Sequence, residues 1–159
     1  MTVQPTQGGA NAIAAGRLWA GGAATAVVAA LIALVGILVA RGVFDVPVLA
    51  PKGEGTWGDA DTFKYALFCG LAALVATGLM HLLLLMSTPR PLQFFRWIIG
   101  LATVAAALAP FIANGTTASK IATGLINLIV GIAIGSLVSG SARAATRARR
   151  TYPRPEGSY

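Results

Sequence analysis

The sequence predicts an all-α membrane protein, a bundle of four transmembrane helices with one larger outer loop between the first and second helices. Of its 159 residues, 56% are apolar and only 11% are charged. Four windows contain no Asp, Glu, Lys or Arg, namely 18–40, 65–89, 97–119 and 121–142. About 20 apolar residues cross a hydrocarbon core of roughly 30 Å as a helix. A soluble bundle would need a polar stripe on each helix, and these windows have none.

The transmembrane domain is expected at residues 17–142, with spans at about 18–40, 65–87, 94–113 and 120–141. The first span follows no basic cluster, so we expect an uncleaved helix rather than a signal peptide. The third span is long enough only if its helix begins near Pro91, because Asn114 and Gly115 interrupt its far end.

The segments between the spans carry start and stop signals. Ser87 and Thr88 offer a hydroxyl cap ahead of the third helix, and Thr117 or Ser119 offers one for the fourth. Residues 1–16 are expected to form a disordered cytoplasmic tail.

The outer loop is expected at residues 41–64. Its apolar stretch 43–49 suits the membrane surface or the side of the bundle, and 53–58 is typical of a turn. Asp59 and Asp61 resemble helix-start chemistry, since carboxylates favour a helix N-terminus. An outer cation site is the alternative for the loop carboxylates, although they follow no EF-hand pattern.

Basic residues at the helix ends predict the orientation. With the N-terminus inside, the cytoplasmic side receives eight of them, namely Arg17, Arg90, Arg96, Arg143, Arg147, Arg149, Arg150 and Arg154. The outer side then receives four, namely Arg41, Lys52, Lys64 and Lys120. Both termini are therefore expected in the cytoplasm of a multi-pass plasma-membrane protein.

The basic cytoplasmic tail, residues 143–159, allows two interpretations. Its arginines at 143, 147, 149 and 150 lie just beyond the last span, where each basic side chain gains roughly 1 kcal/mol near anionic lipid. An orientation signal followed by a disordered end explains the same residues without a partner. Nucleic acid is not expected as a partner, because the net charge of +7 is concentrated where the topology requires it.

Two strongly polar side chains fall inside the spans. His81 lies six residues before Ser87, about 9 Å from the inner end of its helix, and Asn127 lies about 10 Å from the outer end of its own. The two are therefore too far apart to share a hydrogen bond. Thr25 and Ser136 fall at the depth of His81, so either hydroxyl is a geometrically suitable partner. Intramembrane ionisable groups are functional candidates, whereas a paired neutral imidazole would only hold helices together.

The residue types for catalysis are scarce. One histidine and one cysteine, Cys69, cannot form a closed zinc site, and no acidic residue lies within a span. Haem or di-iron centres need paired histidines or several inward carboxylates. We therefore expect no cofactor, no metal and no enzymatic activity.

Small residues repeat along one face of the fourth helix, at Gly124, Gly131, Gly135 and Ser139. Small residues let helices approach closely in lipid, where the hydrophobic drive for association is lost. We expect this face to pack within the chain, and pairing with another membrane protein or with a second copy is the alternative.

Five stretches carry a family resemblance: GRLWAGG, ARGVFDVPVLAP, GDAD, MHLLLLMSTPRPLQFFRWI and INLIVGIAIGSLV. Together they resemble an uncharacterised family of four-span integral membrane proteins from actinobacteria, over about residues 16 to 145. The resemblance implies the plasma membrane of a high-GC Gram-positive bacterium. It supplies no activity, cofactor or catalytic residue.

These observations support two functional hypotheses. The first is a non-catalytic accessory or scaffold subunit that docks against a larger membrane assembly of the envelope-transport or respiratory type. The second is a small self-assembling transporter or channel for a small solute, a proton or a lipid-like ligand, in which His81 and Asn127 act from opposite leaflets around a shared cavity.

Overall fold

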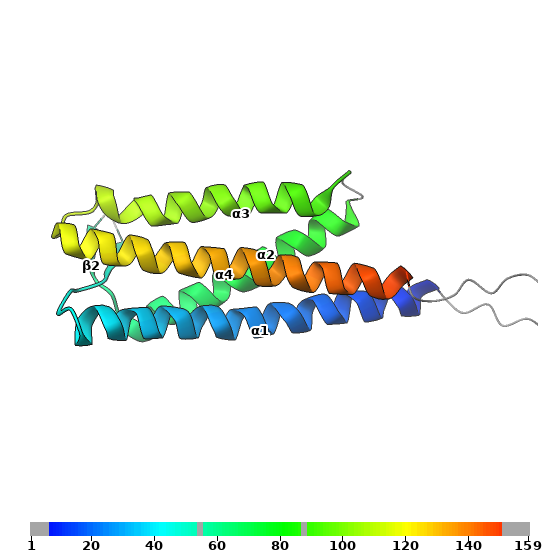
Figure 1. The fold of residues 1–159 in the computed structure, drawn as a ribbon, viewed down its shortest axis with the longest axis horizontal. Helices are drawn as coiled ribbons and strands as arrows, with labels where there is room; N and C mark the ends of the chain where they lie inside the picture. The colour runs from blue at the N-terminus through cyan, green and yellow to red at the C-terminus, as the bar shows by residue number, and fades with distance from the viewer. Residues whose placement is uncertain (1–6, 54–55, 87–88, 151–159) are drawn as a thin grey trace, which may run out of the picture.

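The computed structural model describes residues 7–53, 56–86 and 89–150 of the chain. It contains four long helices and a two-stranded hairpin (Figure 1): α1 Gln7–Gly42, β1 Leu49–Gly53, β2 Thr56–Asp59, α2 Thr62–Leu85, α3 Pro91–Leu108 with a short 3-10 helix η1 Ala109–Ile112, and α4 Thr117–Arg150. The far ends of the two expected tails, 1–6 and 151–159, lie outside the described residues.

Each of the four helices is long and apolar enough to cross a membrane. The candidate spans are Ala15–Gly42, Thr62–Leu85, Pro91–Ile112 and Thr117–Arg147. The expected four-helix arrangement is thus confirmed for length and hydropathy. The third helix does begin at Pro91, where the fixed φ of proline suits the first helical turn.

The first and last helices are longer than expected. The helix α1 already begins at Gln7, so residues 7–16 are helical and not the disordered tail that the sequence suggested. The helix α4 likewise continues to Arg150, past the expected boundary at residue 142. A 34-residue helix is about 51 Å long, well beyond a core of roughly 30 Å. The extension of α4 consists mainly of alanine and arginine, which favour helix even in water.

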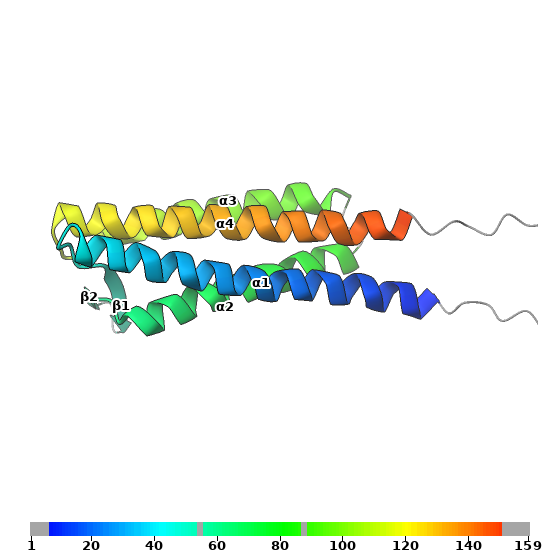
Figure 2. The ribbon, with the colours of Figure 1, turned by 60° about the horizontal axis from the view of Figure 1, so that its bottom comes forward.

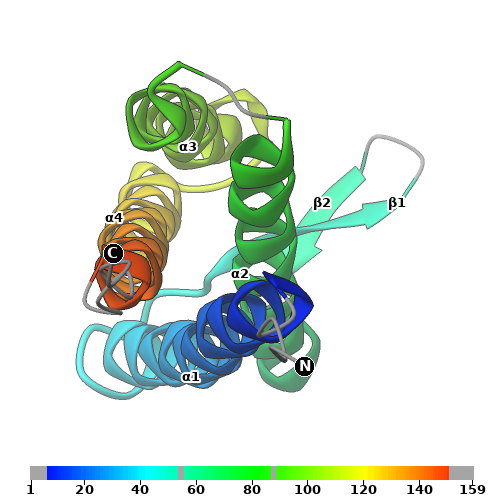
Figure 3. The same ribbon diagram turned by 90° about the vertical axis from the view of Figure 1, so that its right-hand side faces the viewer.

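The helices are packed in the spatial order α2, α1, α4, α3 (Figure 3). Contacts between α2 and α3, which are consecutive in the chain, are few. The core consists largely of small side chains such as Ala29, Ala33 and Ala73, all fully buried, and Phe95 is its largest buried side chain. Small residues at the contacts allow close helix packing.

The start of α1 and the end of α4 lie at the same end of the bundle, which also contains the connection from α2 to α3 (Figures 1 and 2). We call this the terminal end. The opposite end holds the β1–β2 hairpin and the η1 turn, and we call it the hairpin end.

The loop between α1 and α2 differs from the expectation. Residues 56–59 form an antiparallel strand with Leu49 opposite Asp59, rather than part of a turn. The apolar stretch 43–49 is divided, because Val48 and Leu49 are buried while Val43 and Phe44 are exposed. A local sequence cannot encode this division, since it depends on α4: the Leu49 N–H donates to Thr123 Oγ1 at 2.9 Å.

Two helix starts show how capping was only partly foreseen. Asp61 caps α2 as expected, accepting from the N–H groups of Phe63 and Lys64. The cap of α4 is Thr116, whose hydroxyl accepts from the N–H of Ser119, rather than Thr117 or Ser119 itself. The expected cap of α3 at Ser87 and Thr88 lies outside the described residues.

Candidate functional site

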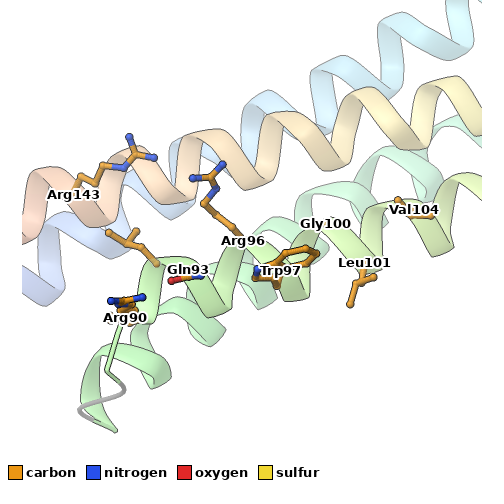
Figure 4. Close-up of a pocket in the computed structure, with 10 residues that line it drawn as sticks. Arg90, Gln93, Arg96, Trp97, Gly100, Leu101, Val104 and Arg143 are labelled. Carbon is orange, nitrogen blue, oxygen red and sulfur yellow. The ribbon is translucent and has the colours of Figure 1, made fainter.

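An open groove lies at the terminal end, formed by α3 with the preceding Arg90 and one residue of α4, and has a volume of about 1010 Å³ (Figure 4). Three arginines line it, Arg90 and Arg96 from the start of α3 and Arg143 from α4. We call this feature the arginine groove. Its apolar wall includes Trp97, Leu101 and Val104, and these side chains are 67%, 65% and 51% exposed.

The groove follows from helical spacing. Gln93, Trp97, Leu101 and Val104 recur at intervals of three or four residues, which places them along one face of α3. Arg96 and Arg143 extend on the α4 side of the groove, and Arg90 lies apart from them at the start of α3 (Figure 4). The sequence pattern assigns Arg90 and Arg96 to the orientation of the chain and does not predict the groove. The spacing from 93 to 104 was the available signal, but it says nothing about the arginine on α4.

The charges at the two ends of the bundle are arranged differently. At the hairpin end, Arg41 pairs with Asp59 at 2.7 Å and also donates to Thr62 Oγ1 and the Ala60 carbonyl. Within the described part of the chain, the carboxylates are Asp45, Asp59 and Asp61, all in or beside the α1–α2 connection. No ion pair to Arg90, Arg96 or Arg143 occurs among the described residues. Within the part of the chain that the structure describes, the groove is therefore a positive site without a counter-charge.

His81 bonds to a residue that the sequence analysis did not consider. The indole Nε1–H of Trp19 donates to His81 Nδ1 at 2.9 Å, with the two rings edge to face. The hydroxyls expected as partners bond to their own helices instead, Thr25 to the Gly21 carbonyl and Ser136 to the Ala133 carbonyl. A serine or threonine hydroxyl inside a helix readily donates to a carbonyl one turn earlier, which explains why these two are not available to the imidazole.

Asn127 belongs to a separate network near the hairpin end. Its side-chain oxygen accepts from the Tyr65 hydroxyl, and its Nδ2 donates to the Ala106 carbonyl at 2.8 Å. The amide thereby connects α2, α3 and α4. His81 lies near the end of α2, whereas Asn127 on α4 bonds Tyr65 near the start of α2, so the structure does not bring these two predicted site residues together.

The small-residue face of α4 lies against α3. A Cβ atom at Gly124 would fall 2.8 Å from the Ala107 carbonyl oxygen, and one at Gly135 would fall 3.2 Å from Ile99 Cγ2. A Cβ at Gly131 would collide with the Thr103 side chain. Ser139 is buried on the same helix, and its Oγ has no partner within the described residues. The glycines of this face thus pack against α3 of the same chain.

The expected basic tail is divided by the structure. Arg143 lines the groove, whereas Arg147 is exposed one turn further along α4. Arg149 and Arg150 belong to the last turn of α4, and their side chains lie outside the described residues. Only the first of the four expected tail residues can therefore be placed in a site.

Groups with metal-binding chemistry do not cluster in the region that the structure covers. No set of three or more His, Cys, Asp or Glu side chains that could hold an ion occurs among the described residues. Cys69 is a free thiol within α2. The groove offers guanidinium groups beside an aromatic and apolar wall, a combination that suits the binding of an anionic group.

The fold and the site together define a multi-helix protein with four membrane-crossing candidates and a basic groove at one end. A family of unknown function, DUF6069, matches residues 13–144, and the chain belongs to this family. No curated protein and no solved structure matches the chain.

Proposed function

We propose that the protein is a four-span integral membrane protein of an actinobacterial plasma membrane, with both termini in the cytoplasm. We further propose that it has no catalytic activity and serves as an accessory or scaffold subunit of a larger membrane assembly. The observation that carries the proposal is the pairing of the intramembrane polar groups within the chain. Trp19 bonds His81 near the terminal end and Tyr65 bonds Asn127 near the hairpin end, so the two pairs lie at separate depths.

The same pairing weakens the transporter alternative. A conducting path needs polar groups that face a common aqueous space. The hydroxyl groups of buried Thr77 and Thr123 instead donate hydrogen bonds to carbonyls of their own helices. A small-solute flux that disappears in both His81→Ala and Asn127→Ala would favour the alternative over the scaffold.

The exposed face of α2 is the most suitable docking surface for a scaffold. This helix contacts mainly α1 and leaves large apolar side chains uncovered, including Phe63, Leu67, Phe68, Leu71 and Val75. Three of them, at 67, 71 and 75, recur every four residues and so form one stripe. Lipid chains cover such a stripe in an isolated protein, and a partner helix would replace them.

The test is crosslinking in intact membranes. A photo-crosslinking residue at Leu71 should capture a defined membrane protein, while one at Ile132 on α4, also exposed, serves as the matched control position. Capture of lipid alone at Leu71, together with a purely monomeric protein after extraction in mild detergent, would contradict the scaffold role.

The orientation is tested separately, on a Cys69→Ala background. A membrane-impermeant thiol reagent should label Val43→Cys at the exposed hairpin end in intact cells. It should label Ala144→Cys at the terminal end only after permeabilisation. The reverse pattern would place both termini outside.

A further inference from the structure

We propose that the arginine groove binds an anionic phospholipid, whose phosphate lies between Arg96 and Arg143 and whose acyl chain follows Leu101 and Val104. Nothing in the scaffold role requires this site, so the inference goes beyond the proposed function. It depends on the proposed orientation only for the identity of the leaflet.

The charge of the groove selects an anion. Three arginines from two helices line the groove, Arg96 and Arg143 extend on the same side of it (Figure 4), and no carboxylate among the described residues pairs with them. Guanidinium offers a planar set of donors that suits phosphate oxygens in a bidentate arrangement. Like charges gathered without a counter-charge repel one another, so a bound anion lowers the free energy of this arrangement.

The shape of the groove selects a lipid rather than a water-borne anion. Its volume of about 1010 Å³ is far larger than a phosphate ion needs. From Arg90 to Val104 the groove follows 14 residues of helix, about 21 Å from its charged end along α3. That distance carries it from the headgroup level well into one leaflet of a hydrocarbon core of roughly 30 Å.

The wall of the groove changes along this length from polar to apolar. Arg90 and Arg96 lie toward the start of α3, Trp97 follows, and Leu101 and Val104 lie deeper, each more than half exposed. Tryptophan favours the headgroup level of a bilayer. A phospholipid presents the same sequence of chemistry, an anionic phosphate followed by glycerol and an alkyl chain, and basic pockets between helices are typical sites for anionic headgroups.

The test compares two lipids that differ only in the headgroup. The detergent-solubilised full chain is titrated with dioleoyl phosphatidylglycerol or dioleoyl phosphatidylcholine, and bound lipid is counted by native mass spectrometry. We expect a preference for phosphatidylglycerol that falls about fivefold in Arg96→Gln and again in Arg143→Gln, given the usual contribution of one basic residue near anionic lipid.

The matched control is Arg17→Gln. This arginine is exposed at the same end of the bundle but does not line the groove, so its loss should leave the preference within about twofold, because screened charges at a distance contribute little. If either glutamine variant fails to remain monodisperse, Arg96→Lys and Arg143→Lys replace them. These lysine variants keep the charge and lose the planar donor set, and a smaller fall in the preference is expected.

Three outcomes would overturn the proposal. Equal loss in Arg17→Gln and Arg96→Gln would show a diffuse charge effect rather than a site. Displacement of the lipid by glycerophosphoglycerol at similar concentration would show that the groove holds a soluble phosphate ester. Equal binding of the two lipids, combined with tighter binding of a glutamate-rich peptide to wild type than to Arg96→Gln, would assign the groove to an acidic segment of a partner protein.

Discussion

The two ends of the bundle treat their charges in opposite ways. At the hairpin end, Arg41 is bonded to Asp59, Thr62 and the Ala60 carbonyl, and Lys64 lies 3.8 Å from Asp61. At the terminal end, three arginines share a groove without a carboxylate among the described residues. Arg41 and Lys64 at the hairpin end thus have carboxylate partners within the chain, whereas the arginines of the groove have none among the described residues.

The difference separates basic groups that contribute to folding, at the hairpin end, from basic groups that remain available to bind an anion, in the groove. The hairpin end folds onto the helices through Leu49, which donates to Thr123 and packs against Gly115, and through buried Val48. Its basic groups hold that structure in place. The arginines of the groove make no ion pair within the described residues. Four substitutions, some with a matched control, test how the two ends differ.

The largest effect is expected from a methyl group at the tightly packed hairpin end. In Gly124→Ala the new Cβ would fall 2.8 Å from the backbone oxygen of Ala107, so α3 must move away from α4. Overpacking of this kind costs about 1–3 kcal/mol, against a gain of up to about 1 kcal/mol in helix propensity. We expect a net loss of thermal stability in detergent.

Gly140→Ala is the matched control, on the same helix toward the terminal end. A Cβ there meets nothing within 4 Å, so only the propensity gain of up to about 1 kcal/mol remains. Equal shifts in the two variants would show that α3 and α4 are not in close contact at Gly124.

The second effect is the release of the hairpin by Arg41→Met. The substitution removes one ion pair and two hydrogen bonds of Arg41, whose side chain is only 34% exposed. We expect a loss of about 1–2 kcal/mol after allowance for solvent, seen as faster hydrogen exchange of the Ala60 N–H, which donates to the Val48 carbonyl. Lys64→Met, which removes a looser and more exposed pair, should change this exchange much less. Similar rates in both variants would show that Arg41 does not anchor the hairpin.

The third effect concerns the terminal half of the bundle and should be smaller. Trp19→Phe keeps an aromatic ring beside His81 but removes the donor of the 2.9 Å hydrogen bond. Hydrogen bonds between transmembrane helices average about 0.6 kcal/mol, so we expect a loss near that value in the free energy of unfolding. A loss several times larger, or a loss of a cellular activity without a loss of stability, would give His81 a role beyond joining α1 and α2.

The smallest effect is local and depends on pH. The N–H of Lys64 donates to the Asp61 carboxylate and, with the nearby ammonium group, holds the pKa of Asp61 below its usual value. A depressed carboxyl pKa stabilises the fold above the pKa of the unfolded chain, and this contribution is lost as the pH falls through the folded-state pKa. We therefore expect the first turn of α2 to loosen in acid, below about pH 4.

Asp61→Asn isolates this titration, because asparagine caps helices about as well as aspartate and carries no charge. Hydrogen exchange at Phe63 and Lys64, corrected for the intrinsic pH dependence, should respond to acid in wild type and not in the variant. An unchanged acid response in Asp61→Asn would assign it to another carboxylate.

The sequence by itself determined the four helices, the approximate limits of α2 and α3, and the cap at Asp61, because length, apolar composition and capping chemistry are properties of short stretches of chain. It also indicated correctly that His81 and Asn127 are too far apart to share a bond, since both positions follow from helical rise alone. Only the tertiary structure decided that Trp19 bonds His81, that Arg143 joins Arg96 in a groove, and that the α1–α2 connection pairs as strands against α4. Helices that are apolar all round carry no stripe to show which face turns inward, so their rotation and order, and with them every contact between helices, are fixed only when the helices pack.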